Sequence, residues 1–470
     1  MVRFPPAARA VLAALFVLGC ARSPGVQVPA EPPPKVRCTY RVSAPARAPF
    51  VVSVNARCEG GKISGFRAQS PALARFVQAS RAPQGAVFGA PAAELSYRVD
   101  LDAMARALDD LDSASRFGSS LVAPASSFLL QPDPEPNGAP AEVRFDGPVV
   151  TGLRRGASGY VIETHELRVA TYTAFGAREL RSVDAGGMRL NVALLDGPLD
   201  VSFDAVARWV ERAGRAVVSF YGRPLDTDVS VILAPLPDRR GIPFGKLLPE
   251  SGPGVVVLVG EHTAEPELYR DWVLVHELFH VGSPSFQGEG KWLDEGLATY
   301  FEPIIRARAG FISEAEVWAE FLGAMPRGLP ALGARGLEHS ESYADTYWGG
   351  GLFCLLADVE ARRRSAGRHG LEDGVRAVLA AGGIASEVWP LARSLDVADR
   401  ALGGPLLAVL AERHARQGNP VDLGALFRDL GVFSAPGGGV RFDETARLAA
   451  VRRVLVGGTA AQGRPAPPAP

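Results

Sequence analysis

The chain has 470 residues, a length that allows two or three domains, each with a core of its own. A hydrophobic fraction of 47% and a charged fraction of 21% are typical of a soluble globular enzyme. The formal net charge is −1, so no excess of positive charge points to nucleic acid as a partner.

The N-terminus has the pattern of a secretory signal. Two arginines in the first nine residues precede an apolar run from Ala10 to Leu18, which is too short to span a bilayer permanently. The run ends in Val17-Leu-Gly-Cys20, which resembles a bacterial lipobox. We therefore expect residues 1–20 to be a signal peptide, Cys20 to be lipidated, and the exported protein to be anchored to a cell-envelope membrane. An ordinary signal peptide with an incidental cysteine is the alternative.

Export changes the interpretation of the other cysteines. Residues 21–37 are a proline-rich tether that cannot build a core. Beyond it, Cys38 and Cys58 flank residues of β type, and an oxidising compartment would permit a disulfide between them, which would add about 3 kcal/mol of stability. Two unpaired buried thiols are the alternative. Cys354 lies in an apolar run and is expected to be a buried helix residue.

Residues 38–196 read mainly as β-structure. Strand-like runs are separated by glycine, proline and aspartate, among them residues 50–55, 161–169 and 188–194. Residues 98–116 are a more helical interruption. The sequence predicts a β-rich N-terminal domain with insertions.

The periodicity changes near residue 200. Apolar residues recur at helical spacing from Val201 to Tyr221. Two short apolar runs, Val229–Ala234 and Val255–Val259, suit buried strands. A helix is expected from about Glu265 to Val281, and nearly everything after about Ala331 reads as helix.

The helix expected around residue 276 contains the pattern H-E-x-x-H. His276 and His280 would project about 40° apart around the helix axis and about 6 Å apart along it, so both imidazoles can bind one cation. Glu277 lies about 100° from His276, where its carboxylate can accept a proton from metal-bound water. The other residues of this helix are apolar, which indicates a buried helix. Two histidines that other buried groups satisfy are the alternative.

A third ligand follows on the next predicted helix, which opens with Trp292-Leu-Asp-Glu295-Gly-Leu-Ala-Thr-Tyr300. Glu295 would complete the three protein ligands that a catalytic zinc takes beside one open position. Glu302 lies on the same helix face and is the rival ligand, whereas Asp294 is expected to point elsewhere. Thr299 is a candidate hydrogen-bond partner for a ligand. The pattern predicts one Zn²⁺ per chain.

These motifs resemble the gluzincin zinc metallopeptidases, in which H-E-x-x-H is followed by W-x-x-E-G-x-x-x-Y. Tyr343-Ala-Asp-Thr-Tyr347-Trp-Gly-Gly-Gly351 is similar to their Y-x-K-G segment. The nearest resemblance, over about residues 200–380, is to the glycyl aminopeptidases, and the aminopeptidase N and leukotriene hydrolase family is close to them. It implies that Tyr347 donates a hydrogen bond to the oxyanion during catalysis. Tyr343, or no catalytic tyrosine at all, are the alternatives.

The sequence departs from the family pattern in three places. The spacing before Glu295 is a few residues shorter, Gly349 replaces the lysine of Y-x-K-G, and no G-x-M-E-N segment precedes the zinc helix. Residues 241–245 and 254–260 stand where that strand should lie. We expect Gly254–Gly260 to be the edge strand that pairs with substrate. No carboxylate for a substrate's free amine is apparent, with Glu261 the first to test, so the choice between aminopeptidase and endopeptidase stays open.

Together these features predict a multi-domain α+β protein. Its parts are the β-rich domain at 38–196, a thermolysin-like α/β zinc peptidase domain at 197–330, an α-helical lobe at 331–458 and a disordered tail at 459–470. We expect an exported, membrane-anchored lipoprotein that hydrolyses a peptide or protein substrate with a zinc-activated water. A zinc-containing binding lipoprotein without activity and a structural lipoprotein without metal are the alternatives.

Overall fold

The structure, a computed structural model, describes residues 36–225, 228–286, 290–437 and 439–457. The predicted signal peptide with Cys20, nearly all of the tether and the predicted tail lie outside these residues. The described residues belong to one compact unit. None of their helices is both long enough and apolar enough to cross a membrane.

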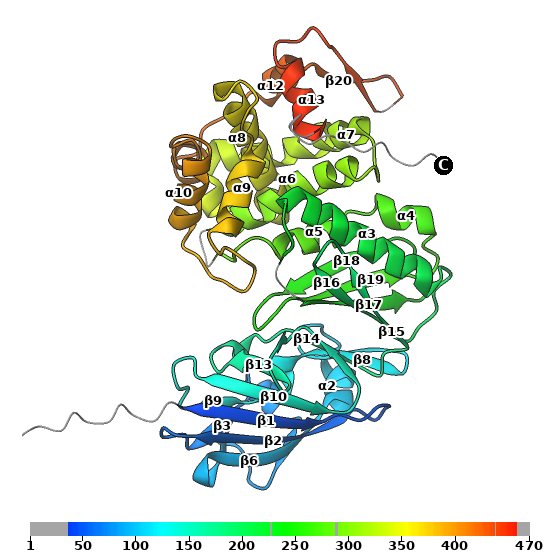
Figure 1. The fold of residues 1–470 in the computed structure, drawn as a ribbon, viewed down its shortest axis with the longest axis vertical. Helices are drawn as coiled ribbons and strands as arrows, with labels where there is room; N and C mark the ends of the chain where they lie inside the picture. Colours follow the sequence, from blue (N-terminus) through cyan, green and yellow to red (C-terminus); the bar gives the residue numbers. More distant parts are fainter. Residues whose placement is uncertain (1–35, 226–227, 287–289, 438, 458–470) are drawn as a thin grey trace, which may run out of the picture. The chain divides into compact units, whose positions relative to one another are not determined.

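The N-terminal region is built on a seven-stranded sheet in the order β12-β13-β10-β1-β2-β6-β4 (Figure 1). Buried and exposed side chains alternate along its long strands, so one face of the sheet covers a hydrophobic core. β1 begins inside the predicted tether. The strands are β1 (Arg37–Ser43), β2 (Val51–Glu59), β4 (Val77–Ala79), β6 (Glu94–Asp100), β10 (Pro140–Asp146), β12 (Arg154–Arg155) and β13 (Tyr160–Glu163).

Two smaller sheets complete this region, one in the order β11-β14-β8-β7 and one in the order β5-β3-β9. Their strands are β3 (Gly65–Arg67), β5 (Val87–Gly89), β7 (Ser115–Phe117), β8 (Ser120–Pro124), β9 (Gln131–Asp133), β11 (Val149–Thr151) and β14 (Tyr172–Phe175). The helices are α1 (Pro71–Ala74) and α2 (Leu101–Leu108), with short turns η1 (Pro91–Ala93), η2 (Ala125–Ser127) and η3 (Glu166–Arg168).

The cysteines lie as the sequence indicated. The register of β1 and β2 places Cys38 opposite Cys58, and a disulfide joins them. Cys354 is a buried free thiol in α8 (Gly350–Arg364).

A mixed five-stranded sheet follows, in the order β15-β16-β17-β19-β18. β16, β17 and β19 run parallel, and the outer strands β15 and β18 are antiparallel to their neighbours. The strands are β15 (Glu179–Asp184), β16 (Arg189–Leu194), β17 (Asp228–Leu236), β18 (Phe244–Leu248) and β19 (Gly254–Gly260). The sheet therefore begins before residue 197, and β15 and β16 belong to it rather than to the N-terminal sheets. The sequence did not predict this pairing, because strand propensity does not specify the pairing partner.

The position of β19 corrects a second expectation. We expected Gly254–Gly260 to be an edge strand, but β19 lies between β17 and β18, and β18 is the edge strand on that side of the sheet. The continuous apolar run of β19 is buried on both faces, which is typical of a central strand.

The two faces of this sheet pack on different parts of the chain. Val231 and Val255 belong to the core shared with α3 (Phe203–Tyr221) and α5 (Val273–His280), which lie on one side of the sheet in Figure 1. Ile232 and Val256 face the other way and pack with Val122 and Tyr172 of the N-terminal strands.

The helix expected from residue 265 to 281 is interrupted. α4 (Glu265–Arg270) ends before Asp271, and α5 begins at Val273. The Asp271 carboxylate accepts a hydrogen bond from the Val273 N–H at 2.7 Å. An aspartate that accepts a hydrogen bond from the backbone N–H two residues later forms a local turn, which competes with continuation of the helix.

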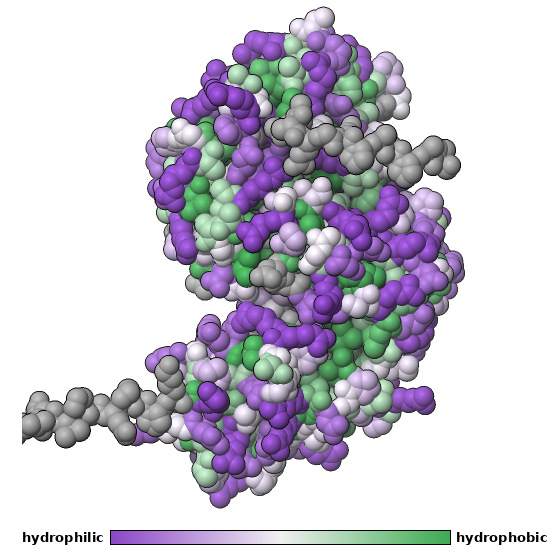
Figure 2. All heavy atoms as spheres, viewed as in Figure 1, coloured by the Kyte–Doolittle hydropathy of each residue, from purple (hydrophilic) through white to green (hydrophobic). Residues whose placement is uncertain are grey.

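The C-terminal half is mainly helical, as expected, although it also holds the hairpin of β20 (Val432–Ser434) and β21 (Val440–Phe442). Hydrophilic and apolar residues are mixed over the face shown in Figure 2. The helices are α6 (Lys291–Arg308), α7 (Glu314–Ala324), α8, α9 (Leu371–Ala380), α10 (Leu391–Ala401), α11 (Leu407–Ala411), α12 (Leu423–Leu430) and α13 (Ala449–Gly457). Short 3-10 helices are η4 (Met325–Gly328) and η6 (Leu337–His339), and short π-helices are η5 (Ala331–Arg335), η7 (Asp345–Gly349) and η8 (Glu412–Arg416).

Helices α6 and α8 touch backbone to backbone. A Cβ at Gly296 of α6 would lie 2.4 Å from the carbonyl carbon of Gly350, and a Cβ at Gly350 would lie 2.0 Å from the Trp292 carbonyl oxygen. No side chain fits between the helices at this point, so glycine is required on both.

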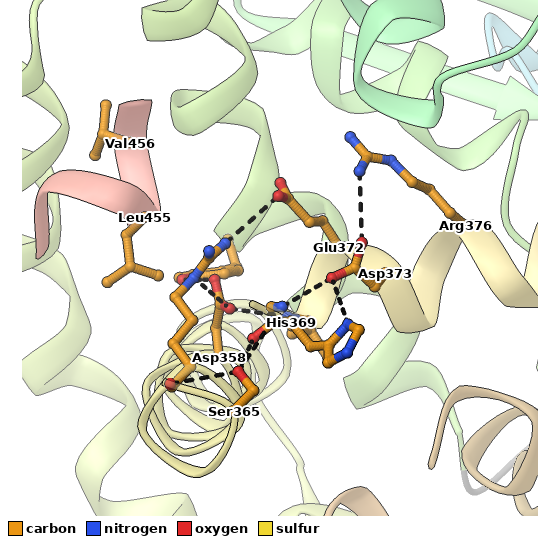
Figure 3. Close-up of polar contacts among 12 residues, drawn as sticks. Asp358, Ser365, His369, Glu372, Asp373, Arg376, Leu455 and Val456 are labelled. Carbon is orange, nitrogen blue, oxygen red and sulfur yellow. Dashed lines mark hydrogen bonds and ion pairs between the residues drawn. The ribbon is translucent and has the colours of Figure 1, made fainter. Parts of the chain in front are cut away.

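Buried charges tie α6 to the helices around it, and two of the charged residues, Asp358 and Glu372, are labelled in Figure 3. Asp358 and Arg362 of α8 and Glu372 of α9 are each at most 1% exposed. The Tyr300 hydroxyl of α6 donates to Asp358 at 2.9 Å, and the Arg362 guanidinium lies 3.0 Å from the same carboxyl group. Arg308 of α6 pairs with Glu372 and also donates to the Leu455 and Val456 carbonyl oxygens of α13.

Removal of one member of this buried cluster should be costly. We expect Arg362→Ala to lower the free energy of unfolding by roughly 3–5 kcal/mol, because Asp358 would remain buried without its cation, although Glu372 would keep Arg308. Arg363→Ala, at the exposed neighbouring position, should have a much smaller effect. Urea denaturation of both variants makes the comparison. Equal losses of stability in the two variants would show that the buried charge cluster does not stabilise the fold more than an exposed ion pair does.

The helix contact gives a second prediction. Gly296→Ala should destabilise the protein by roughly 1–3 kcal/mol or more, because its new methyl group would meet backbone atoms that cannot move aside. Gly323→Ala, in α7 with open space around it, should instead stabilise by about 0.5–1 kcal/mol. Thermal unfolding of the two variants measures the difference. A tolerated alanine at Gly296 would contradict the contact.

Candidate metal centre

Three potential ligands converge between α5 and α6. The Nε2 atoms of His276 and His280 lie 3.3 Å apart. A Glu295 carboxylate oxygen lies 3.2 Å from the His276 Nε2 and 3.6 Å from the His280 Nε2. Two imidazole nitrogens and one carboxylate oxygen are a donor set that catalytic zinc takes, and their closeness fits a single ion. The residues that the sequence predicted as ligands are therefore brought together.

The rival ligand is held elsewhere. Glu302 is buried, and its carboxylate oxygens lie 2.6 and 3.0 Å from the Arg306 guanidinium. Burial raises the pKa of Glu302 to about 8 in spite of this cation. The geometry therefore favours Glu295 over Glu302 as the third ligand.

One contact around the ligands corrects the sequence analysis. Asp294, expected to point elsewhere, places a carboxylate oxygen 3.0 Å from the His280 Nδ1. Adjacent residues of α6 thus reach opposite nitrogens of one imidazole, Asp294 at Nδ1 and Glu295 at Nε2. A carboxylate at the outer nitrogen orients a ligating histidine and makes it more basic. The Thr299 hydroxyl, expected in such a role, is buried with no hydrogen-bond partner among the described residues.

Glu277 lies between the metal ligands and the edge strand. Its carboxylate accepts a hydrogen bond from the Leu247 N–H of β18 at 2.8 Å, and burial raises its pKa. A Cβ at Gly245 would lie 2.4 Å from Val273 and 3.1 Å from Glu277, so the strand comes this close to α5 only with glycine there. This contact was not predicted from the sequence, in which the glycine at position 245 is the one indication of it.

Tyr347 stands beside the ligands. It lies in η7, directly before α8, and its ring stacks on His276 with the centroids 5.7 Å apart. Burial and then the Glu295 charge raise the pKa of Tyr347, so its phenol stays a hydrogen-bond donor. Tyr343 stacks on the outside of Tyr347 and is 58% exposed. Of the two tyrosines, Tyr347 is the one that contacts a metal ligand.

An exposed aromatic side chain lies beside these groups. The Trp272 ring lies 5.2 Å from that of His276 and is 38% exposed. Other large exposed apolar residues are scattered along the chain. Aromatic rings that stay open to solvent beside a polar centre are suited to contact a ligand.

Comparison by sequence gives little. No family model matches the chain. A curated match, to an error-prone DNA polymerase of Mycolicibacterium paratuberculosis, is 30% identical over 187 residues and covers 35% of this chain. The chain spans 15% of that polymerase's length, a share too small to indicate a function.

Comparison by structure shows the fold. An aminopeptidase N family protein from Idiomarina loihiensis matches with a TM-score of 0.63 and 14% identity, over 87% of this chain and 82% of its own. A mutant of a two-domain M1 zinc metallopeptidase, bound to L-arginine, matches with a TM-score of 0.51 and 14% identity. This match covers 82% of the present chain and 94% of the metallopeptidase chain. The β-rich, α/β and helical parts expected from the sequence are confirmed, and the chain has the same fold as these aminopeptidase N family and M1 metallopeptidase structures.

Proposed function

We propose that the protein is a zinc-dependent peptidase that hydrolyses peptide bonds. The observation that carries the proposal is the convergence of His276, His280 and Glu295 beside the buried carboxylate of Glu277. The fold shared with zinc metallopeptidases supports the proposal, as does the stacking of Tyr347 on His276, one of the three candidate ligands.

The roles of the residues follow from their positions. A zinc ion held by the three ligands would supply Lewis acidity for the scissile carbonyl and for the attacking water. Glu277, fixed by the Leu247 N–H, accepts the proton of that water and passes it to the leaving amine. Tyr347 donates a hydrogen bond to the oxyanion that develops on the substrate. Asp294 holds the His280 ring in its ligating orientation.

Strand β18 offers the surface for the substrate backbone. It pairs only with β19 among the described strands, so its other edge carries unpaired backbone groups. The Leu247 N–H, which donates to Glu277, places that edge beside the general base. A peptide added to this edge would therefore bring its backbone to the metal centre.

Metal content tests the ligand set. The purified mature protein should contain about one zinc per chain. Glu295→Gln should lose most of the metal, and Glu302→Gln should keep it, because Arg306 rather than the metal holds that carboxylate. Elemental analysis by mass spectrometry after dialysis gives the answer. The reverse pattern would assign the third ligand to Glu302.

Activity tests the chemistry. Glu277→Gln should abolish cleavage of a peptide library while zinc content is retained, since it removes the base and not a ligand. Tyr347→Phe should lower kcat by roughly 10²–10³, the cost of one oxyanion donor. Tyr343→Phe is the matched control and should stay near the wild-type kcat. A larger defect in the Tyr343 variant would move the role to that residue.

Substrate length distinguishes an endopeptidase from an aminopeptidase. We expect aminoacyl anilides to be poor substrates and N-acetylated peptides to be cleaved about as well as free ones, because pairing along an edge strand rewards length. The kcat/KM of one peptide with and without acetylation measures this. Loss of cleavage on acetylation would reveal an amine-binding carboxylate. Glu250, just past β18, would then be tested first, since one of its carboxylate oxygens is buried without a hydrogen-bond partner among the described residues. Glu261 instead accepts a hydrogen bond from the Asp238 N–H.

We further propose that the protein is exported and anchored to the cell-envelope membrane through a lipid on Cys20. The lipobox pattern at residues 17–20 supports this proposal. Mass spectrometry of the mature N-terminus, with Cys20→Ser as control, tests it, and an unmodified cysteine would refute it.

A further inference from the structure

Tyr343 has no part in the chemistry proposed above, yet its ring completes a stack that starts at the metal centre. The rings of His276 and Tyr347 are nearly parallel, with an interplanar angle of 11° and centroids 5.7 Å apart. The rings of Tyr347 and Tyr343 are also nearly parallel, at 19° and 3.9 Å. His276 is 2% exposed and Tyr343 is 58% exposed, so the stack runs from a buried candidate ligand to the surface, with Tyr347 in the middle.

The backbone beside Tyr347 is fixed by the residues that follow it. A Cβ at Gly328 of η4 would lie 2.4 Å from the Trp348 carbonyl oxygen and 2.4 Å from the Gly349 nitrogen. Gly350 touches the backbone of α6 in the same way. Backbones that are in contact on two sides leave little room for displacement. The freedom that remains to Tyr347 is therefore rotation of its side chain.

The sequence around Tyr347 supplies one large neighbour for its ring. Side chains three and four positions apart are neighbours on a helical surface. At three of these positions stand Ala344, Gly350 and Gly351, which carry at most a methyl group. The fourth position holds Tyr343. Gly350 cannot carry a side chain because of its contact with α6, so within this segment the restraint of the Tyr347 ring falls to Tyr343.

We propose that Tyr343 is a positioning residue for Tyr347, an inference that rests on the proposed peptidase function. A hydrogen-bond donor stabilises an oxyanion when it lies about 3 Å from the place that the oxygen occupies in the transition state. Rotation of an unrestrained tyrosine side chain would carry the hydroxyl group well away from that place. Tyr343 closes the outer face of the Tyr347 ring and His276 closes the inner face, so the phenol keeps one direction.

The test compares two substitutions at position 343. Tyr343→Leu removes the aromatic face and should lower kcat about tenfold or more, because a displacement of about 1 Å at a reacting group can cost about 10²-fold. KM should stay close to its wild-type value, since the oxyanion develops only in the transition state. Tyr343→Phe keeps the ring and should rescue kcat. Leu180→Ala, at a similarly exposed position of β15, is the control and should change neither constant.

A double-mutant cycle decides whether Tyr343 acts through Tyr347. In the Tyr347→Phe protein no hydroxyl group remains to be directed, so Tyr343→Leu should cause almost no further loss of kcat. An equal loss in both backgrounds would show that Tyr343 contacts the substrate itself and would overturn the proposal. Unchanged kcat in Tyr343→Leu would also overturn it, as would equal defects in Tyr343→Leu and Tyr343→Phe.

The mobility of the ring gives a readout that does not depend on catalysis. In protein labelled with 3-fluorotyrosine, the Tyr347 resonance is identified by its absence from the spectrum of Tyr347→Phe. Fluorine relaxation should show a restrained ring in the wild type and in Tyr343→Phe, and faster ring motion in Tyr343→Leu. If the wild type cleaves no peptide while Tyr343→Leu frees the ring, the peptidase function fails and the positioning of Tyr347 stands. Equal ring mobility in the wild type and in Tyr343→Leu would overturn the positioning role even if peptides are cleaved.

Discussion

The position of α6 is the constraint on which the candidate centre depends. Its first turn brings Asp294 and Glu295 to the two nitrogens of His280. One residue later, Gly296 lets α8 approach until the backbones touch, which sets the position of η7 and its Tyr347. The buried charges between Tyr300 and α13 then fix the far end of α6. Because α6 is held at both ends, Glu295 and Tyr347, the proposed ligand and oxyanion donor, keep one geometry.

Strand β18 is the second element that joins structure to function. Its glycine at position 245 allows contact with α5, and its Leu247 N–H donates to Glu277, the proposed general base. A peptide paired with the other edge of this strand would therefore lie beside Glu277.

Much of the candidate site could be read from local patterns. A spacing of four residues on one helix is enough to bring His276 and His280 together. Glu295 follows near the start of the next helix, in the motif that opens with Trp292. Asp294 and Leu247 could not be found in this way. Asp294 acts because α6 crosses α5 at a particular angle, and Leu247 acts through a backbone group that any residue carries.

By itself, the sequence predicted the fold class, the buried helix of the H-E-x-x-H pattern and the candidate ligand residues, because periodicity and side-chain chemistry are local properties. The tertiary structure alone decided that β15 and β16 pair with β17, that β18 is the edge strand, and that Glu302 is held by Arg306 instead of joining the ligands. Strand pairing and helix contacts are set by packing between distant segments, and the free energy of that packing does not appear in any local pattern.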